Sequence, residues 1–199
     1  SDGTIERIDL SDGSTIWRSE PWSAALNAAA AAPPPGAWIE LASGRRASPR
    51  GVLAVSDRNF VVLADRTGRF AAMSNSTGEL TWSSYFPRGQ LVSLDAASSS
   101  LVAVFRAARE DGAAGVEHIV SLINPEDGSE IAALTGLGPR VDWVRLTPSG
   151  DLVIGAGGVT LSIALPEGEQ LWAYPTPGGA APVAAVIFDG RVGLLDRAG

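Results

Sequence analysis

Short apolar runs separated by small turn-forming residues recur along most of the chain. Examples are "GVLAVSD" (51–57), "NFVVLAD" (59–65), "SLVAVFRA" (100–107) and "VTLSIAL" (159–165). These runs are rich in Val, Leu, Ile and Phe, and their flanks carry Gly, Asn, Asp and Ser, which favour turns. Because each run is too short for a typical helix, the pattern predicts an all-β chain.

One motif, a turn containing Gly followed by a short strand, occurs four times. The four copies are "SDGSTIW" (11–17), "STGELTW" (76–82), "EDGSEIAAL" (126–134) and "PEGEQLW" (166–172). The last three turn glycines are spaced by about 40 to 50 residues, the period of a four-stranded propeller blade. The low-complexity stretch "AAAAAPPPG" (28–36) lengthens the first interval and reads as an inserted loop.

The repeat predicts a β-propeller of four-stranded antiparallel blades, each made of three strands, a Gly turn and a last strand. The expected organisation is a partial blade (1–20), an insertion (21–47), blades at about 48–87, 88–138 and 139–176, and a partial blade (177–199). The two partial blades could complete one blade of a small four-bladed ring, or the chain could be part of a larger propeller. We favour the larger propeller, since open sheet edges are a liability.

A tryptophan opens the last strand in three of the four repeats. Trp17, Trp82 and Trp172 are predicted to be structural residues that wedge between neighbouring blades, where each indole buries a large apolar area.

Composition narrows the classes of partner and of chemistry. The net charge is −7, and all 15 basic residues are Arg, without a basic run long enough to bind nucleic acid. The absence of Cys excludes disulfides, thiolate nucleophiles and Cys-ligated zinc. No run of 18 apolar residues exists, so we expect no membrane span in this chain.

Candidate catalytic residues are few, and each has a structural explanation. His118, the only His, lies in an alternating strand pattern, and the carboxylate pairs Glu110/Asp111 and Glu126/Asp127 lie in expected loops or turns. "GAGG" (155–158) stands between two strands with no helix after it, which favours a hairpin turn over a phosphate loop. We therefore predict no enzyme, no catalytic residue, no cofactor and no metal site.

The stretch "LADRTGRFAAMSNSTGELTW" (63–82) resembles the blade motif of quinoprotein-type, PQQ-like propellers. The motif is an apolar strand, an Asp, a Gly turn, a strand of small residues, "TG" and then Trp. The resemblance implies the propeller fold. A quinone-dependent dehydrogenase is the enzyme alternative, but such enzymes often use adjacent cysteines, which this chain lacks, and a calcium-binding acidic set that cannot be placed here.

Within these propellers, one member is more similar than the others. The order of "NFVVLADRTGRFAAMSNSTGELTW" (59–82) and then "LVAVFRAAREDGAAGVEHIVSLINPEDGSEIAAL" (101–134) is similar to the lumenal propeller of the largest subunit of the ER membrane protein complex. This resemblance covers about residues 1–175. It implies a non-enzymatic scaffold in the ER lumen whose partners are other protein subunits of a membrane insertase complex. The alternative is a periplasmic scaffold for outer-membrane assembly in bacteria.

Three surface features are candidates for modification or contact. Asn75 begins the N-glycosylation sequon Asn75-Ser76-Thr77, which fits a lumenal location. Arg45, Arg46 and Arg50 form the one basic cluster and could contact a partner carboxylate or a lipid phosphate. The insertion is expected to project from the propeller and to meet partners, so deletion of residues 24–35 should weaken partner binding.

Overall fold

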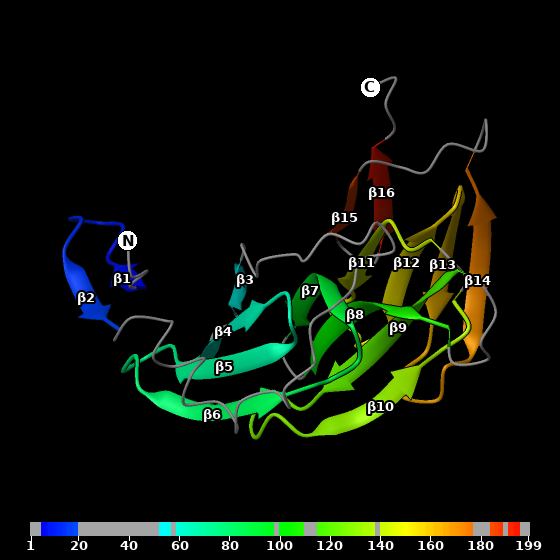
Figure 1. The fold of residues 1–199 in the computed structure, drawn as a ribbon. Coiled ribbons are helices and arrows are strands. Elements are labelled where there is room, and N and C mark those ends of the chain that lie inside the picture. Colours follow the sequence, from blue (N-terminus) through cyan, green and yellow to red (C-terminus); the bar gives the residue numbers. More distant parts are fainter. Residues whose placement is uncertain are drawn as a thin grey trace. The chain divides into compact units, whose positions relative to one another are not determined.

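The computed structural model describes residues 5–19, 52–56, 59–97, 100–109, 115–137, 140–176, 184–188 and 191–195. All the secondary-structure elements within these ranges are strands (Figure 1). They fall into two compact units, one formed by residues 1–91 with 125–129 and the other by residues 92–124 with 130–199.

The first unit contains a two-stranded sheet and a four-stranded sheet. β1 (Glu6–Ile8) pairs with β2 (Thr15–Arg18). The larger sheet has the order β3-β4-β5-β6, with all neighbouring strands antiparallel. Its strands are β3 (Val52–Ser56), β4 (Phe60–Asp65), β5 (Arg69–Ser74) and β6 (Leu80–Tyr85).

The second unit contains two four-stranded sheets and a hairpin. One sheet runs through β7 (Gln90–Ala97), whose first two residues belong to the first unit, β8 (Ser100–Ala108), β9 (Val116–Ile123) and β10 (Glu130–Leu134). The other runs through β11 (Trp143–Leu146), β12 (Leu152–Ala156), β13 (Val159–Ile163) and β14 (Gln170–Pro175). The hairpin pairs β15 (Ala184–Phe188) with β16 (Arg191–Leu195).

This arrangement confirms the predicted fold class, an all-β chain of four-stranded antiparallel sheets in which strand order follows chain order. Burial falls across each sheet toward its last strand. β12 is buried at its first four positions, whereas every residue of β14 is exposed. The hydrophobic runs recognised in the sequence therefore form the buried central strands. The last strand of each four-stranded sheet lies at the edge of that sheet.

In the second unit, the two four-stranded sheets pack their apolar faces together. Val102, Val104, Val120 and Leu122 of the first sheet form one cluster with residues of the second, namely Val144, Leu146, Leu152, Ile154 and Ile163. Asp95 of β7 adds a polar link, because its Oδ2 accepts a hydrogen bond of 2.9 Å from the backbone N–H of Leu146. Burial of these β-branched and leucine side chains is the main stabilising term of this unit.

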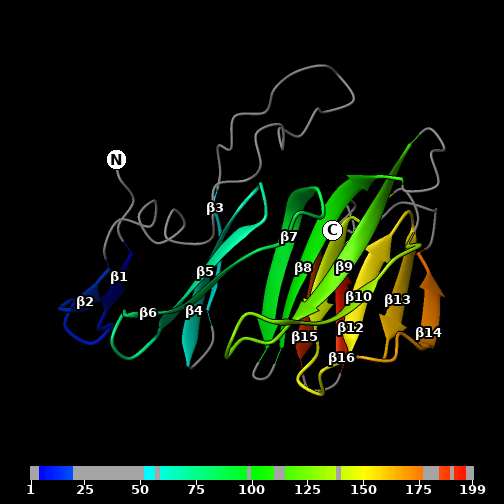
Figure 2. The same ribbon diagram turned by 60° about the horizontal axis from the view of Figure 1, so that its bottom comes forward.

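The hairpin of β15 and β16 covers the other face of the second of these sheets. Figure 2 shows it beside β11 and β12, and Ala185 joins Trp143 and Val153 in a small buried cluster. The indole of Trp143 lies directly over Gly155 on the paired strand β12, where a side chain would collide with the ring. The "GAGG" segment is confirmed as a hairpin turn, since Gly157 and Gly158 connect β12 to β13 with positive φ angles.

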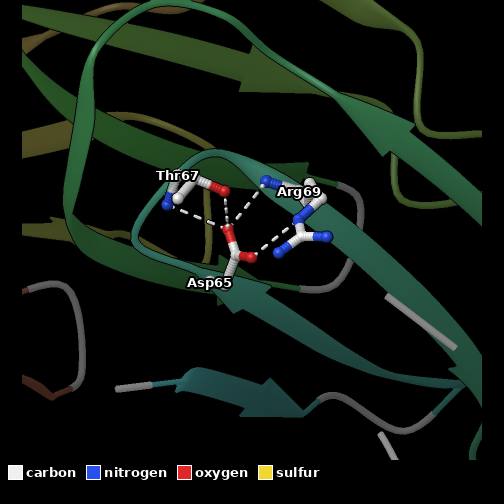
Figure 3. Close-up of polar contacts among 3 residues, drawn as sticks. All are labelled: Asp65, Thr67 and Arg69. Atoms are coloured by element: carbon white, nitrogen blue, oxygen red, sulfur yellow. Dashed lines mark hydrogen bonds and ion pairs between the residues drawn. The ribbon is translucent and has the colours of Figure 1, made fainter. Parts of the chain in front are cut away.

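In the first unit, the turn between β4 and β5 is built around a buried carboxylate (Figure 3). One oxygen of Asp65 accepts hydrogen bonds from the Thr67 amide (2.9 Å), the Thr67 hydroxyl (2.6 Å) and the Arg69 amide (3.1 Å). Its other oxygen lies 2.8 Å from Nε of Arg69. Asp65 is 3% exposed, so this charge is stabilised by donors from its own turn in place of water.

Replacing Asp65 with Ala should destabilise the first unit by about 3 kcal/mol, because the substitution removes the buried acceptor that the Arg69 side chain and two amides share. The free energy of unfolding in urea measures this loss. Glu6→Ala is the control, since it removes the ion pair to Arg18, whose side chain is 63% exposed, and should cost under about 1 kcal/mol. Equal losses for the two variants would contradict a structural role for the Asp65 turn.

Candidate interaction surface

The four Gly turns share one backbone geometry. Gly13, Gly78, Gly128 and Gly168 have φ angles of 76°, 75°, 72° and 78°, in the left-handed region that favours glycine. Three of these turns also have the same pair of backbone hydrogen bonds. In the turn that ends at β6, for example, the Gly78 N–H donates to the Ser74 carbonyl (2.8 Å) and the Ser74 N–H to the Glu79 carbonyl (2.9 Å).

Two of the predicted tryptophans pack on the Gly turn of a later repeat. A Cβ added at Gly78 would lie 2.7 Å from Cε3 of Trp17, and one added at Gly128 would lie 2.5 Å from Cε3 of Trp82. Each indole N–H donates to the carbonyl three residues before that glycine, from Trp17 to Asn75 (2.8 Å) and from Trp82 to Pro125 (2.7 Å). We call this arrangement of the glycine and the carbonyl the Trp seat.

The third repeat places a residue other than Trp on the Gly turn of the fourth repeat. Ala132 stands where the other repeats have Trp, four residues after the turn glycine. Leu134, two residues further along β10, instead contacts Gly168, where an added Cβ would lie 2.9 Å from its Cδ2. The sequence analysis missed Leu134 because it searched for Trp, although an apolar residue at this end of "EIAAL" was a visible signal.

Trp172 lies at the same position of its own repeat but is 40% exposed. The neighbouring Leu171 and Tyr174 are 50% and 48% exposed, so the outer strand β14 carries a row of exposed large apolar side chains. Among the residues that the structure describes, Trp172 does not pack on a glycine turn. Its predicted role as a wedge between blades stays a prediction.

A β-bulge precedes the Trp position in every repeat, a feature that the sequence analysis did not predict. The pairing register passes over one residue of the outer strand at each of these places. We call these bulge residues, and they are Ile16, Thr81, Ile131 and Leu171. Because a bulged residue is left out of the ladder, its side chain can face solvent, and the three apolar members are 47% to 51% exposed.

In each unit, the exposed apolar bulge residues form a candidate surface for binding another protein. Ile16 belongs to the first unit, and Ile131 and Leu171 belong to the outer strands β10 and β14 of the second. An outer strand offers unpaired backbone groups, and its bulge adds an exposed apolar side chain. Such an edge can bind an extended or apolar segment of another protein.

Aspartate side chains accept hydrogen bonds within two of the Gly turns. The hydroxyl and the amide of Ser129 both donate to Asp127 and hold the pKa of its carboxyl below its ordinary value of 3.8. Ser11 does the same to the pKa of Asp9, and the amide and hydroxyl of Ser14 lower the pKa of Asp12. The predicted pair Glu126/Asp127 therefore lies in an exposed turn, and Asp127 has a local structural partner.

The remaining sequence candidates do not converge on one place. Asn75 is half-buried, and its carbonyl accepts hydrogen bonds from Trp17 and from Arg7 (2.6 Å). His118 is 6% exposed in β9, opposite Arg106. The predicted contacts Arg45, Arg46 and Arg50, the insertion 21–47 and the pair Glu110/Asp111 lie outside the described residues.

The described ranges contain neither a cluster of metal-ligating side chains nor a helix that could span a membrane. No group of three or more His, Asp or Glu residues is placed there to hold a metal ion. Within the same ranges, none of the elements is a helix that is long and apolar enough to cross a bilayer.

The successive four-stranded sheets with their repeated seats define the chain as blades of a PQQ-like β-propeller. The model of a family described as "Outer membrane protein assembly factor BamB" matches residues 1–113, which is more than half of the chain. The protein therefore belongs to this family. None of the curated proteins matches the sequence.

Solved structures with low sequence identity share the fold. BamB from Moraxella catarrhalis superposes with a TM-score of 0.53 at 14% identity, over 96% of this chain and 48% of that chain. The computationally designed Ika8 protein gives 0.51 at 18% identity, over 70% and 40%. A chain of the mitotic checkpoint complex gives 0.54 at 13%, over 75% and 46%. The matched part of this chain thus covers less than half of each of these structures.

Gly128→Ala should destabilise the protein by about 2 kcal/mol more than Gly136→Ala, as measured by urea unfolding. Both glycines have nearly the same φ, 72° and 75°, so the backbone strain is matched. Only Gly128 forms a seat, whereas a Cβ at Gly136 would meet no atom within 4 Å. Trp82 is 8% exposed and its indole is hydrogen-bonded, so it cannot move aside cheaply. Equal losses would show that the seat contributes nothing.

Ser129→Ala should raise the pKa of Asp127 toward 3.8, because the hydroxyl bond is the largest cause of the lowered value. A carboxyl with a lowered pKa in the folded state stabilises the fold above its ordinary pKa and loses that contribution as the pH falls through the folded-state value. Ser129→Ala should therefore lower the stability above about pH 4, and this difference from the unmodified protein should disappear as the pH falls below the folded-state pKa of Asp127. A carboxyl-carbon NMR titration measures the pKa, with Asp12 and its intact partner Ser14 as the internal control.

Proposed function

We propose that this protein is a non-enzymatic scaffold that binds protein subunits of a bacterial envelope complex concerned with outer-membrane protein assembly. The observation that carries the proposal is the family match over residues 1–113. The family description names an assembly factor. A propeller scaffold of this kind would bind other proteins through its exposed strands and would catalyse no reaction.

The family description supports the periplasmic alternative of the sequence analysis. The ER interpretation, a lumenal part of a membrane insertase complex, rests on the resemblance of residues 59–82 and 101–134 and on the sequon at Asn75. A periplasmic scaffold and a lumenal scaffold would use the same kind of surface. They differ in whether Asn75 carries a glycan and in which membrane proteins accompany the chain.

The bulge residues of the outer strands are the proposed contact points. Ile131 is 51% exposed in β10, which is the last strand of its sheet among the described residues. An apolar segment that covers it would gain hydrophobic contact together with main-chain hydrogen bonds. The net charge of −7 favours a neutral or basic partner segment over an acidic one.

The test is affinity purification of the tagged protein from its native host in mild detergent, followed by mass spectrometry. We expect stoichiometric recovery of envelope proteins, including a β-barrel protein, and no glycan on Asn75. Recovery of the chain alone would contradict the scaffold proposal. Recovery of small proteins with several membrane-spanning helices, together with a glycan on Asn75, would favour the insertase reading instead.

Ile131→Asp should reduce partner recovery at least tenfold, since it places a charge in an apolar contact. Leu80→Asp is the matched control. Leu80 is 45% exposed in the outer strand β6, but it is paired with Met73 in the ladder and is not bulged. Circular dichroism and the unfolding midpoint show whether both variants fold. Unchanged recovery with Ile131→Asp would remove the bulge residue from the partner interface.

A further inference from the structure

Charged side chains occupy the backbone edge of β11, the first strand of its sheet. Thr147, directly after β11, donates its N–H to the chain that leads into β12 (2.8 Å). Because bonded and non-bonded positions alternate along an antiparallel pair, Val144 and Leu146 turn their backbone groups away from β12. The Leu146 N–H donates to Asp95. The Val144 carbonyl accepts a hydrogen bond of 2.8 Å from Nη1 of Arg145. A further strand could add to this edge only by displacing both contacts.

The opposite edge of the same sheet, β14, is limited by a proline. The Thr176 N–H donates to the Gly158 carbonyl (2.8 Å). By the same alternation, Ala173 and Pro175 turn their backbone groups away from β13. Proline has no N–H, so Pro175 removes one of the donors that a further strand would use at this edge.

In the first unit, the outward positions of the last strand, β6, are partly covered. The Phe86 N–H donates to the Gly68 carbonyl (2.9 Å), which places the backbone groups of Ser83 and Tyr85 on the side away from β5. Both residues are half-buried, and the bulge residue of this strand is the polar Thr81. β6 therefore offers less access to its backbone than an exposed edge does, and its bulge carries no apolar side chain.

β10 has none of these limits. It is the last strand of its sheet among the described residues (Figure 1). Its bulge precedes Ala132, which holds the Trp position, as the bulges of β6 and β14 precede Trp82 and Trp172. The next residue, Ala133, is therefore the one that turns its N–H and carbonyl outward. Ala133 and the bulge residue Ile131 are both exposed, and the strand contains no Pro.

We propose that an extended segment of the partner protein adds to β10 as a further strand, with its carbonyl accepting the Ala133 N–H and an apolar side chain lying over Ile131. This inference rests on the proposed scaffold function and names the strand that the function uses. A strand is the favoured occupant because the edges of β11 and β14 carry features that hinder strand addition, and β10 lacks them. The net charge of −7 favours a neutral or basic segment.

Ala133→Pro tests the inference in the affinity purification from the native host in mild detergent. The substitution removes the outward N–H, whereas the bonds from β10 to β9 belong to the residues on either side of Ala133. We expect the recovery of the envelope proteins to fall roughly tenfold, because the partner carbonyl loses its donor. Ala173→Pro is the matched control, since it removes the corresponding donor from β14. Ala133→Val keeps the N–H, and both of these variants should recover as much partner as the unmodified protein.

Hydrogen–deuterium exchange keeps the test decisive if circular dichroism shows that Ala133→Pro does not fold. The Ala133 amide should exchange more slowly in the purified complex than in the unmodified chain alone, whereas the Ala173 amide should not change. Equal exchange of Ala133 in the two states, or full partner recovery with a folded Ala133→Pro, would overturn the β10 contact and leave the scaffold function standing. An equal loss of partner with Ala173→Pro would also overturn it. Recovery of no partner by the unmodified protein would contradict the proposed function itself, and this contact with it.

Discussion

The contact between a wedge side chain and a glycine turn is the constraint on which the rest of this structure depends. The turn must be glycine for two reasons, a φ near +75° and a neighbouring ring closer than any Cβ would allow. The carbonyl three residues earlier then orients the indole through one hydrogen bond. Because the same strand that follows the turn carries the next wedge, each repeat is both an acceptor and a donor. This coupling explains why the turn and the Trp recur together in the sequence.

The β-bulges belong to the same arrangement. In each outer strand the bulge separates the turn from the Trp position by one extra residue, so that the wedge side chain faces its seat while the bulged residue leaves the ladder. A solvent-facing side chain at that point is a consequence of the backbone. The bulge residue is Ile or Leu in three repeats. In the remaining repeat it is Thr81, whose hydroxyl donates to the Ala72 carbonyl (3.0 Å). The apolar choice is thus not required by the fold and is available for binding.

The sequence predicted the features that local patterns encode and missed those that depend on pairing or packing. The strands of β4, β8 and β12 follow from their apolar runs, and the turns follow from Gly with Asp, Asn or Ser. The bulges could not be read from single strands, since they are defined by a shift against the partner strand. Leu134 was missed because its repeat lacks Trp. The burial of Asp65 was missed because "DRTG" has the composition of a solvated turn, and only the packed structure removes water from the carboxylate.

The exposed apolar residues have two physical origins. Leu10 and Trp172 are exposed while their counterparts in other repeats, Pro125 and Trp82, are buried by a wedge contact. Completing that contact would bury them. Ile131, in contrast, is exposed in a repeat whose Gly128 seat and Leu134 wedge are both occupied, so closing further seats leaves it in solvent. A contact that covers Leu10 or Trp172 would therefore leave Ile131 exposed and able to bind a different protein.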